Sequence, residues 1–427
     1  MRRRPESQAN YFAKAVEGWV RRQRWFPRTT SPLVADALWE LRPDVYILVM
    51  RAGDDGPLLQ VPLVVAQKKS ERDRDSVGNS VPVGELSDAL LFDGTALAEF
   101  WQAWAAVAEV TRGTRDGLLK SASKVRPLGV EQSNTSVLLL GSEDPLLAKA
   151  FRVLHAGAHP EVEIPSALTN DNWPGVAPVW AYWDLPQENA EGLCSAVVST
   201  AVQEAADGFD YFVEMATQGK DPSATAETLG SLIGSLHNRL ADLLGESEPP
   251  SVGEVRSQLE DALSDAAQHG LSSDEADAVK HHLCANGLLP DSLETKPIRI
   301  HGDLHLGQLL RSGQGQWVVV DFEGEPLRDL AARRRPALPM RDVAGMLRSF
   351  DYAAVAGRAE DPMWARSARE AFLRGYDTSR LLTEEDRAVL DALELEKALY
   401  EVSYEGRFRP DRLPIPLEAV RRIVNPL

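Results

Sequence analysis

Two short segments around residue 300 constrain this chain more than any other part of its sequence. The first follows a short apolar run, Ile298–Ile300, and carries His301, Asp303, His305 and Gln308. The second is a run of valines, Val318–Val320, that ends in Asp321 and Glu323. We predict that the two apolar runs form a hairpin-like pair of strands with the acids at its open end.

The order of these side chains is typical of phosphotransferases. Protein-kinase-like enzymes use a catalytic Asp, then an amide side chain, then a metal-binding Asp. Asp303 is therefore the candidate that orients an acceptor hydroxyl, with His301 in the same catalytic set. Gln308 and Asp321 are candidates for holding Mg²⁺, with Glu323 as a further metal candidate, because amide and carboxylate oxygens suit a hard cation. The alternative is an ordinary strand–loop–strand with solvated acids, since turns are often acidic.

Bulk composition narrows the class of protein. The chain has 427 residues, which is enough for two or three domains, and a formal net charge of −18. That charge argues against nucleic acid or an anionic membrane surface as the main partner. Two cysteines fit a reducing compartment. The basic first residues are not followed by an apolar run, and no apolar stretch approaches the length of a membrane span, so we expect a cytoplasmic, soluble protein. We also expect it to be a monomer.

Residues 1–115 are predicted to form an N-terminal α+β cap subdomain. The sequence predicts a helix over 11–26, strands over 33–41, 45–51 and 57–65, and a helix from Asp93 to Val107. The region holds no set of acid, base and nucleophile, and its Trp and Phe residues fit a hydrophobic core.

Residues 116–208 are predicted to form an intermediate nucleotide-binding subdomain with a β-sheet and a hinge. Two strand-like runs flank a small polar turn whose N–H groups and hydroxyls suit phosphate oxygens. Its candidates are Ser133, Asn134, Thr135 and Ser136. Near the end of this region, Gln203 and Glu204 lead into a hinge whose backbone suits an adenine edge.

Lys149 is the single lysine of the strand-like run 146–152 and has apolar neighbours, and a cation there would pair with the α- and β-phosphates of ATP. The alternative is a surface lysine on an edge strand. We choose Glu163, in the first turn of the following helix, as the partner that orients Lys149. Glu161 is the rival, because helix-dipole stabilisation alone favours acids at both positions.

Residues 209–427 are predicted to form a mostly helical C-terminal lobe. One helix is expected over 225–241, a pair of successive helices within 251–285, and another helix from Thr383, a cap-like residue, to about Arg407. We interpret His237 as a core histidine. The triplet Arg333–Arg335 faces either nucleotide phosphates or solvent, and Arg341–Asp342 is expected to brace the catalytic loop as an ion pair.

An acceptor site is predicted on the last of these helices. Lys397, Glu401, Tyr404 and Glu405 share one helix side. Aromatic and charged groups together suit a carbohydrate, whose C–H face packs on rings while its hydroxyls bind charges. The full set of acceptor candidates is Asp303, His305, Lys397, Glu401 and Tyr404. The alternative is a salt-bridged surface helix.

Over nearly its whole length the chain resembles bacterial maltokinases, which are relatives of the aminoglycoside phosphotransferases. The segments that carry the resemblance are Gln23-Arg-Trp-Phe26, Gln132-Ser-Asn-Thr-Ser136, Lys149-Ala-Phe-Arg152, Pro160-Glu-Val-Glu163, His301-Gly-Asp-Leu-His-Leu-Gly-Gln308, Asp321-Phe-Glu-Gly-Glu-Pro326, Arg341-Asp-Val-Ala-Gly-Met-Leu-Arg-Ser-Phe-Asp-Tyr352, Lys397-Ala-Leu-Tyr-Glu401 and Ile415-Pro-Leu417.

The resemblance implies an α+β, bilobal protein-kinase-like fold with an additional N-terminal cap subdomain. It also implies ATP- and Mg²⁺-dependent phosphorylation of maltose at its anomeric hydroxyl, giving maltose 1-phosphate for α-glucan synthesis. In that activity Asp303 would be the catalytic base, Gln308 and Asp321 metal ligands, Lys149 the phosphate clamp, and Glu323 a second-metal candidate. The alternatives are a kinase of the same fold for glucosamine or an aminoglycoside, and a non-catalytic ATP-binding regulatory protein.

Overall fold

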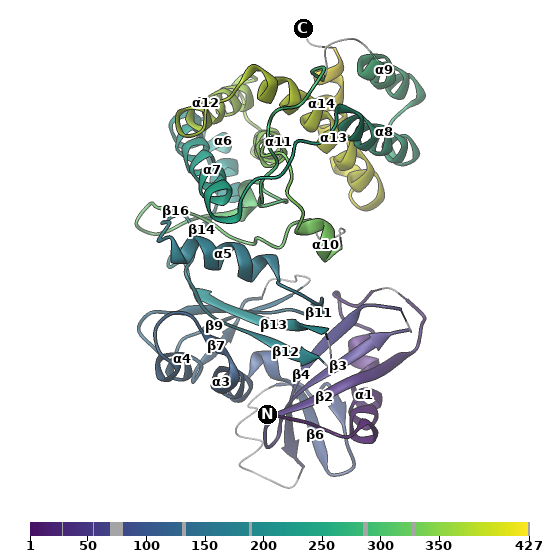
Figure 1. Ribbon diagram of the computed structural model, residues 1–427, viewed down its shortest axis with the longest axis vertical. Coiled ribbons are helices and arrows are strands. Elements are labelled where there is room, and N and C mark those ends of the chain that lie inside the picture. Colours follow the sequence, from purple (N-terminus) through teal and green to yellow (C-terminus); the bar gives the residue numbers. More distant parts are fainter. Residues whose placement is uncertain are drawn as a thin grey trace. The chain divides into compact units, whose positions relative to one another are not determined.

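The computed structural model describes residues 1–27, 29–53, 55–68, 80–129, 134–187, 190–284, 289–325 and 329–425. Its contacts divide the chain into two compact units (Figure 1). Unit 1 comprises Met1–Thr169 and Ala177–Gln203, and unit 2 comprises Asn170–Val176 and Glu204–Leu427. None of the helices in the described ranges combines the length and apolar character needed to cross a membrane.

The first sheet of unit 1 has the strand order β1-β2-β3-β4-β6-β5, and β11 pairs with β4. Its strands are β1 (Arg2–Arg3), β2 (Leu33–Arg42), β3 (Val45–Ala52), β4 (Leu58–Gln67), β5 (Gly84–Glu85), β6 (Ala89–Asp93) and β11 (Val153–Leu154). Helix α1 (Glu6–Val20) buries Phe12, Val16 and Val20 in one cluster with side chains of this sheet. The three predicted long strands are confirmed. The helix predicted over 11–26 begins earlier and ends at Val20, where Gln23 Nε2 binds the Trp19 carbonyl.

The second sheet of unit 1 has the order β7-β12-β13-β10-β9-β8. Its strands are β7 (Glu109–Val110), β8 (Val125–Pro127), β9 (Thr135–Leu139), β10 (Leu146–Ala150), β12 (Val179–Gln187) and β13 (Ala190–Thr200). Helices α3 (Ala98–Val107), α4 (Arg115–Ser121) and α5 (Pro160–Asn170) accompany it. One hydrophobic cluster around Trp101 and Trp104 takes residues from both sheets. The regions predicted as cap and intermediate subdomain therefore share a core.

Unit 2 is mostly helical, as predicted. Its helices are α6 (Gly208–Thr217), α7 (Ser223–Leu244), α8 (Val252–His269), α9 (Ser273–Cys284), α10 (Leu330–Arg333), α11 (Met340–Ala356), α12 (Trp364–Ser379), α13 (Glu384–Phe408) and α14 (Pro414–Val424). Thr383 and Asp386 form the predicted capping box of α13. That helix is not the last, because Pro414 begins α14 after a short 3₁₀ turn.

The hairpin next to the candidate catalytic loop differs from the prediction in its first strand. The strand that pairs antiparallel with β16 (Trp317–Val319) is β15 (Leu309–Arg311). The intervening turn is closed by Gly315, whose φ of 84° an L side chain adopts only with strain. Ile298 instead makes isolated bridges to Glu246 and Ala337. Because Asp303 precedes β15 and Asp321 follows β16, both acids still lie at the open end of the hairpin.

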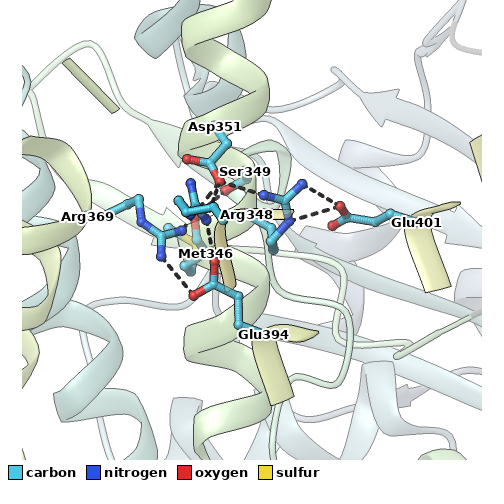
Figure 2. Close-up of polar contacts among 8 residues, drawn as sticks. Met346, Arg348, Ser349, Asp351, Arg369, Glu394 and Glu401 are labelled. Atoms are coloured by element: carbon cyan, nitrogen blue, oxygen red, sulfur yellow. Dashed lines mark hydrogen bonds and ion pairs between the residues drawn. The ribbon is translucent and has the colours of Figure 1, made fainter. Parts of the chain in front are cut away.

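A buried network of charges joins the helices of unit 2 (Figure 2). Arg348 of α11 donates from Nε and Nη2 to Glu401 Oε2 of α13, at 3.0 and 2.8 Å. Arg369 of α12 donates to Glu394 of α13 at 2.8 Å, and Arg348 also pairs with Asp351. Burial opposes the charge of Arg348, but Glu401 and Asp351 raise the pKa of its guanidinium. The network fixes α13 against α11 and α12.

We expect Arg348→Met to lower the free energy of unfolding by about 3–5 kcal/mol, because it leaves Glu401 and Asp351 as buried carboxylates without their main cation. Urea unfolding followed by tryptophan fluorescence measures this. The matched control is Arg366→Met, whose ion pair with Glu370 has side chains 70% and 54% exposed and contributes only about 0–1 kcal/mol. Equal losses in the two variants would contradict the role given to the network.

Candidate functional site

The backbone of the candidate catalytic loop is held by one buried carboxylate. Asp342, in the first turn of α11, is 1% exposed. Its Oδ2 accepts from the N–H of His301 at 2.8 Å, and its Oδ1 accepts from the N–H of Gly302 at 2.9 Å. The predicted bracing role of Asp342 is thus visible, but its neighbour Arg341 forms its ion pair with Glu396, at 2.9 Å.

His237 of α7 also contacts the Asp342 carboxylate. Its Nε2 lies 3.2 Å from Asp342 Oδ2, and its Nδ1 lies 2.8 Å from the Tyr376 hydroxyl. Burial lowers the pKa of His237. Burial alone would raise the pKa of Asp342, but His237 and the backbone N–H of Gly302 hold it below its usual range. A neutral His237 therefore donates from Nε2 to an ionised Asp342 and accepts from Tyr376, which confirms the prediction of a core histidine.

His301 is placed to position the loop rather than to react. It is 1% exposed, and its ring packs on Phe322 with centroids 4.9 Å apart. Its Nε2 donates to the Val320 carbonyl at 2.9 Å, so its Nδ1 is the acceptor for the Asp303 N–H at 3.4 Å. Both ring nitrogens are thus used inside the protein. His301 joins the loop to the residue that precedes Asp321.

Asp303, the candidate base, lies beside a cation from α13. Lys397 Nζ is 3.6 Å from Asp303 Oδ1 and 3.2 Å from Glu325 Oε1, and it lies over the Tyr400 ring at 5.1 Å. Burial opposes the charge of Lys397, but Glu325 and Asp303 raise the pKa of its ammonium. Of the predicted acceptor residues, Lys397 is therefore the one that the structure brings to Asp303.

The remaining predicted acceptor residues have other contacts. His305 Nδ1 accepts from the Gly307 N–H at 3.0 Å and caps the short 3₁₀ turn of the loop. Glu401 belongs to the buried network through Arg348. The Tyr404 ring stacks with Tyr400 at 6.4 Å between centroids. The shared helix side predicted for these residues thus contains a structural carboxylate as well as candidate sugar contacts.

Two of the three predicted metal residues, Gln308 and Asp321, lie close together at the open end of the hairpin. Gln308 Nε2 lies 3.4 Å from Asp321 Oδ2, and the Glu323 carbonyl accepts from Arg333 at 3.2 Å. Asp321 has a φ of 66°, a strained value that Asp tolerates better than most residues. In the described ranges, no three His, Cys, Asp or Glu side chains gather as a metal site. One amide and one carboxylate nevertheless fit Mg²⁺, which takes few protein oxygens and completes its shell with phosphates and water.

Lys149 of β10 is the predicted phosphate clamp in unit 1. It is 9% exposed and lies in register with Ser136 of β9 and Val197 of β13, so it is not on an edge strand. Its Nζ lies 3.7 Å from Glu161 Oε1. The structure therefore gives an ion pair to Glu161, the rival of our choice, while the pairing with Glu163 stays a prediction.

The predicted polar turn before Lys149 is only partly described. Ser133 lies outside the described residues, and Thr135 and Ser136 belong to strand β9 rather than to a turn. Asn134 Oδ1 accepts from the Arg152 N–H at 3.3 Å, and Thr135 Oγ1 accepts from Arg152 Nε at 2.8 Å. Gln203 and Glu204 are exposed and lie where the chain passes from unit 1 to unit 2, and their place near an adenine-binding hinge stays a prediction.

The sequence reasoning missed two residues that the structure ties to the site. Glu325, which binds Lys397, is not among the predicted site residues. Arg152 was read as part of a motif, yet it binds two of the predicted phosphate-binding residues. The available signal for Glu325 was its place in the acidic segment 321–325, two residues after Glu323. Arg152 had no local signal, because its partners lie far along the chain.

Comparisons with known proteins show similarity to phosphotransferases. Residues 124–393 match the phosphotransferase enzyme family, and residues 19–96 match the maltokinase N-terminal cap domain. A glucosamine kinase from Mycolicibacterium smegmatis is 28% identical over 337 residues, which are 72% of this chain and 81% of the relative. A glucosamine kinase from Streptacidiphilus jiangxiensis is 28% identical over 322 residues, 68% of this chain and 71% of the relative.

Among solved structures, one of a glucosamine kinase has a TM-score of 0.69 at 23% identity, covering 94% of this chain and 96% of that one. Another, of a glucosamine kinase in complex with glucosamine, ADP and inorganic phosphate, has a TM-score of 0.65 at 22% identity and the same coverage. The predicted fold, protein-kinase-like and α+β with an N-terminal cap, is confirmed.

The lowered pKa of His237 predicts a specific loss of stability in acid. Because the folded-state pKa lies below the ordinary value of 6.5, the unfolded chain takes up a proton below that pH before the folded chain does. The free energy of unfolding then falls with falling pH, by up to about 1.4 kcal/mol per pH unit for this group.

Urea unfolding at about pH 7.5 and about pH 5.5 tests this with His237→Gln, which lacks the titrating ring. We expect the variant to be less stable than the wild type at the higher pH, and the difference to shrink at the lower pH. The control is His281→Gln on the exposed side of α9, which should keep the wild-type pH dependence. A His237→Gln difference that stays constant would contradict the assignment.

Proposed function

The chain belongs to the phosphotransferase enzyme family, and we propose that it transfers the γ-phosphoryl group of ATP to the anomeric hydroxyl of maltose. The product would be maltose 1-phosphate, a precursor for α-glucan synthesis. The observation that carries the proposal is the position of Lys397 Nζ, 3.6 Å from the candidate base Asp303. The match of residues 19–96 to the maltokinase cap domain supports the same reading.

Lys397 favours a neutral acceptor over an amino sugar. A protonated amine close to Asp303 would face the Lys397 ammonium, whose pKa is raised, and like charges at such a distance repel. The carboxylates that an amino sugar would need are paired with protein cations. Glu325 binds Lys397, Glu401 binds Arg348, and Glu405 binds Arg409. Sugar hydroxyls, in contrast, accept from Lys397 without penalty.

Asp303 is proposed to accept or orient the proton of the attacking hydroxyl. Lys397 holds the Asp303 carboxylate on one side, and the hydrogen bonds of Asp342 and His301 fix the loop backbone on the other. Phosphoryl transfer passes through a loose transition state, so most of the rate comes from positioning and from charge neutralisation. The rigid loop supplies the positioning.

Candidate nucleotide-binding residues are proposed in each unit separately. Gln308 and Asp321 would hold Mg²⁺, with Glu323 as the further metal candidate. When bound, Mg²⁺ would neutralise phosphate charge. Lys149, oriented by Glu161 or Glu163, would pair with the α- and β-phosphates. Ser133, Asn134, Thr135 and Ser136 are proposed at the phosphates, and Gln203 and Glu204 at the adenine.

A kinase for glucosamine is the second candidate, favoured by the names of the two curated relatives at 28% identity. Turnover with maltose, glucose, glucosamine, trehalose and kanamycin, followed by ADP release with Mg²⁺, decides between the candidates. We expect maltose to give the highest kcat/KM. A higher kcat/KM for glucosamine would contradict the argument from Lys397, and ATP binding without turnover of any sugar would favour a non-catalytic protein.

Asp303→Asn should lower kcat on maltose by about 10²–10⁴-fold, because the amide keeps the shape but accepts no proton. The Kd of ADP, measured by calorimetry, should stay within about a factor of two, since Asp303 is not proposed to bind nucleotide. The matched control, Asp411→Asn in an exposed turn, should keep full activity. A fully active Asp303→Asn variant would refute the assignment.

Lys397→Gln should reduce the preference for maltose over glucosamine, measured as the ratio of the two kcat/KM values. We expect a fall of about tenfold, because the variant removes both a donor to sugar hydroxyls and the charge that opposes an amine. Arg407→Gln, on the same helix but paired with Asp265, serves as the control. An unchanged ratio would show that Lys397 does not select the acceptor.

A further inference from the structure

Unit 1 contains a cavity of about 390 Å³ whose arginines have no role in the proposed phosphotransfer, although Asn134, Thr135 and Ser136 on its wall are also proposed at the nucleotide phosphates. One wall is the segment Arg22–Trp25 that follows α1, and the others come from Asp93–Ala96, Pro127–Leu128, the start of β9 and Arg152. Its size lies at the lower end of the range for small-molecule pockets. The cavity is therefore large enough for a ligand of monosaccharide size.

The charge of this cavity is opposite to that of the chain. Arg22, Arg24 and Arg152 line it against a single acid, Asp93, although the whole chain carries a formal net charge of −18. Asp93 is itself bound by Arg152, so its carboxylate is already neutralised. Three guanidinium groups around one hollow are suited to an anion, because each presents a planar fork of donors to phosphate or carboxylate oxygens.

A second observation, independent of the charge of the cavity, also points to a ligand: the hydrogen bonding of Arg152. It is 2% exposed and is fixed on two sides: Nε donates to Thr135 Oγ1 at 2.8 Å and Nη2 to Thr95 Oγ1 at 3.0 Å. The face of its guanidinium lies 5.3 Å from the Trp25 ring centroid. Its Nη1 is buried, and within the described part of the chain it has no hydrogen-bond partner. A buried charged donor that has no acceptor costs folding free energy. An acceptor from a ligand outside the chain therefore fits this position.

We propose that this cavity, between Arg22–Trp25 and Arg152, binds a phosphate monoester of monosaccharide size. The phosphate would accept from Arg152 Nη1 and from the exposed Arg22 and Arg24, and the Trp25 ring offers a face for the C–H groups of a sugar ring. The cavity is a binding site and not a second active site, because its one acid is tied to Arg152.

Calorimetric titration with glucose 6-phosphate, glucose 1-phosphate and inorganic phosphate tests the proposal, with glucose as the neutral probe. Each titration is made without nucleotide and again with saturating ADP and Mg²⁺, because Asn134, Thr135 and Ser136 are also proposed at the nucleotide phosphates. Loss of ester binding in the presence of ADP would overturn the proposal of a separate site. The variant is Arg22→Gln/Arg24→Gln, which changes two exposed side chains and spares the buried Arg152. The control is Arg42→Gln/Arg112→Gln, which removes the same charge from exposed positions outside the cavity.

We expect at least one phosphate ester to bind the wild type with a stoichiometry of one and glucose not to bind. The Arg22→Gln/Arg24→Gln variant should weaken that binding by about tenfold or more, as expected for lost charge-assisted hydrogen bonds, while the control keeps it. Absence of ester binding, or equal weakening in the control, would overturn the proposal. Neither outcome depends on turnover, so a failure here is distinct from a failure of the proposed kinase activity.

Discussion

The carboxylate of Asp342 is the interaction on which the catalytic half of unit 2 depends. It binds two consecutive backbone N–H groups of the loop before Asp303, and the neutral His237 holds it from α7. A buried carboxylate is stable only when its oxygens are satisfied, so α7, α11 and the loop must form together. Asp303 and the hairpin that ends in Asp321 then take their places from this fixed backbone.

The second theme of unit 2 is the pairing of cations on α11, α12 and α13 with acids. Arg348 and Arg369 join α11, α12 and α13, and Lys397 extends the same chemistry from α13 to Asp303. Because α13 is fixed by this network, the position of Lys397 is fixed as well. Helix packing thus determines the geometry of the proposed acceptor site. Its charge depends on which carboxylates are already paired with cations of the protein.

The sequence predicted the local features well. Periodicity placed the long strands of unit 1 and the helices α7, α8, α9 and α13 of unit 2, and the spacing of Asp303, Gln308 and Asp321 predicted that these side chains lie at one end of a hairpin. The sequence-based prediction was wrong where residues far apart in the chain determine the pairing. Leu309, and not Ile298, begins the strand that pairs with the valine run, and the turn of this shorter hairpin contains Gly315. Likewise Glu161 and Glu163 share one helix turn, and only the sheet register of Lys149 brings Glu161 to 3.7 Å.

We propose that the hydroxyl activated at Asp303 is the anomeric one of a neutral sugar. NMR of the product formed from ATP and maltose labelled with ¹³C at its reducing C1 tests this directly. We expect a new phosphorus resonance coupled to the labelled carbon, and a product whose reducing end no longer interconverts between anomers. A phosphate coupled to any other carbon, or a phosphorylated product obtained from glucosamine but not from maltose, would contradict it.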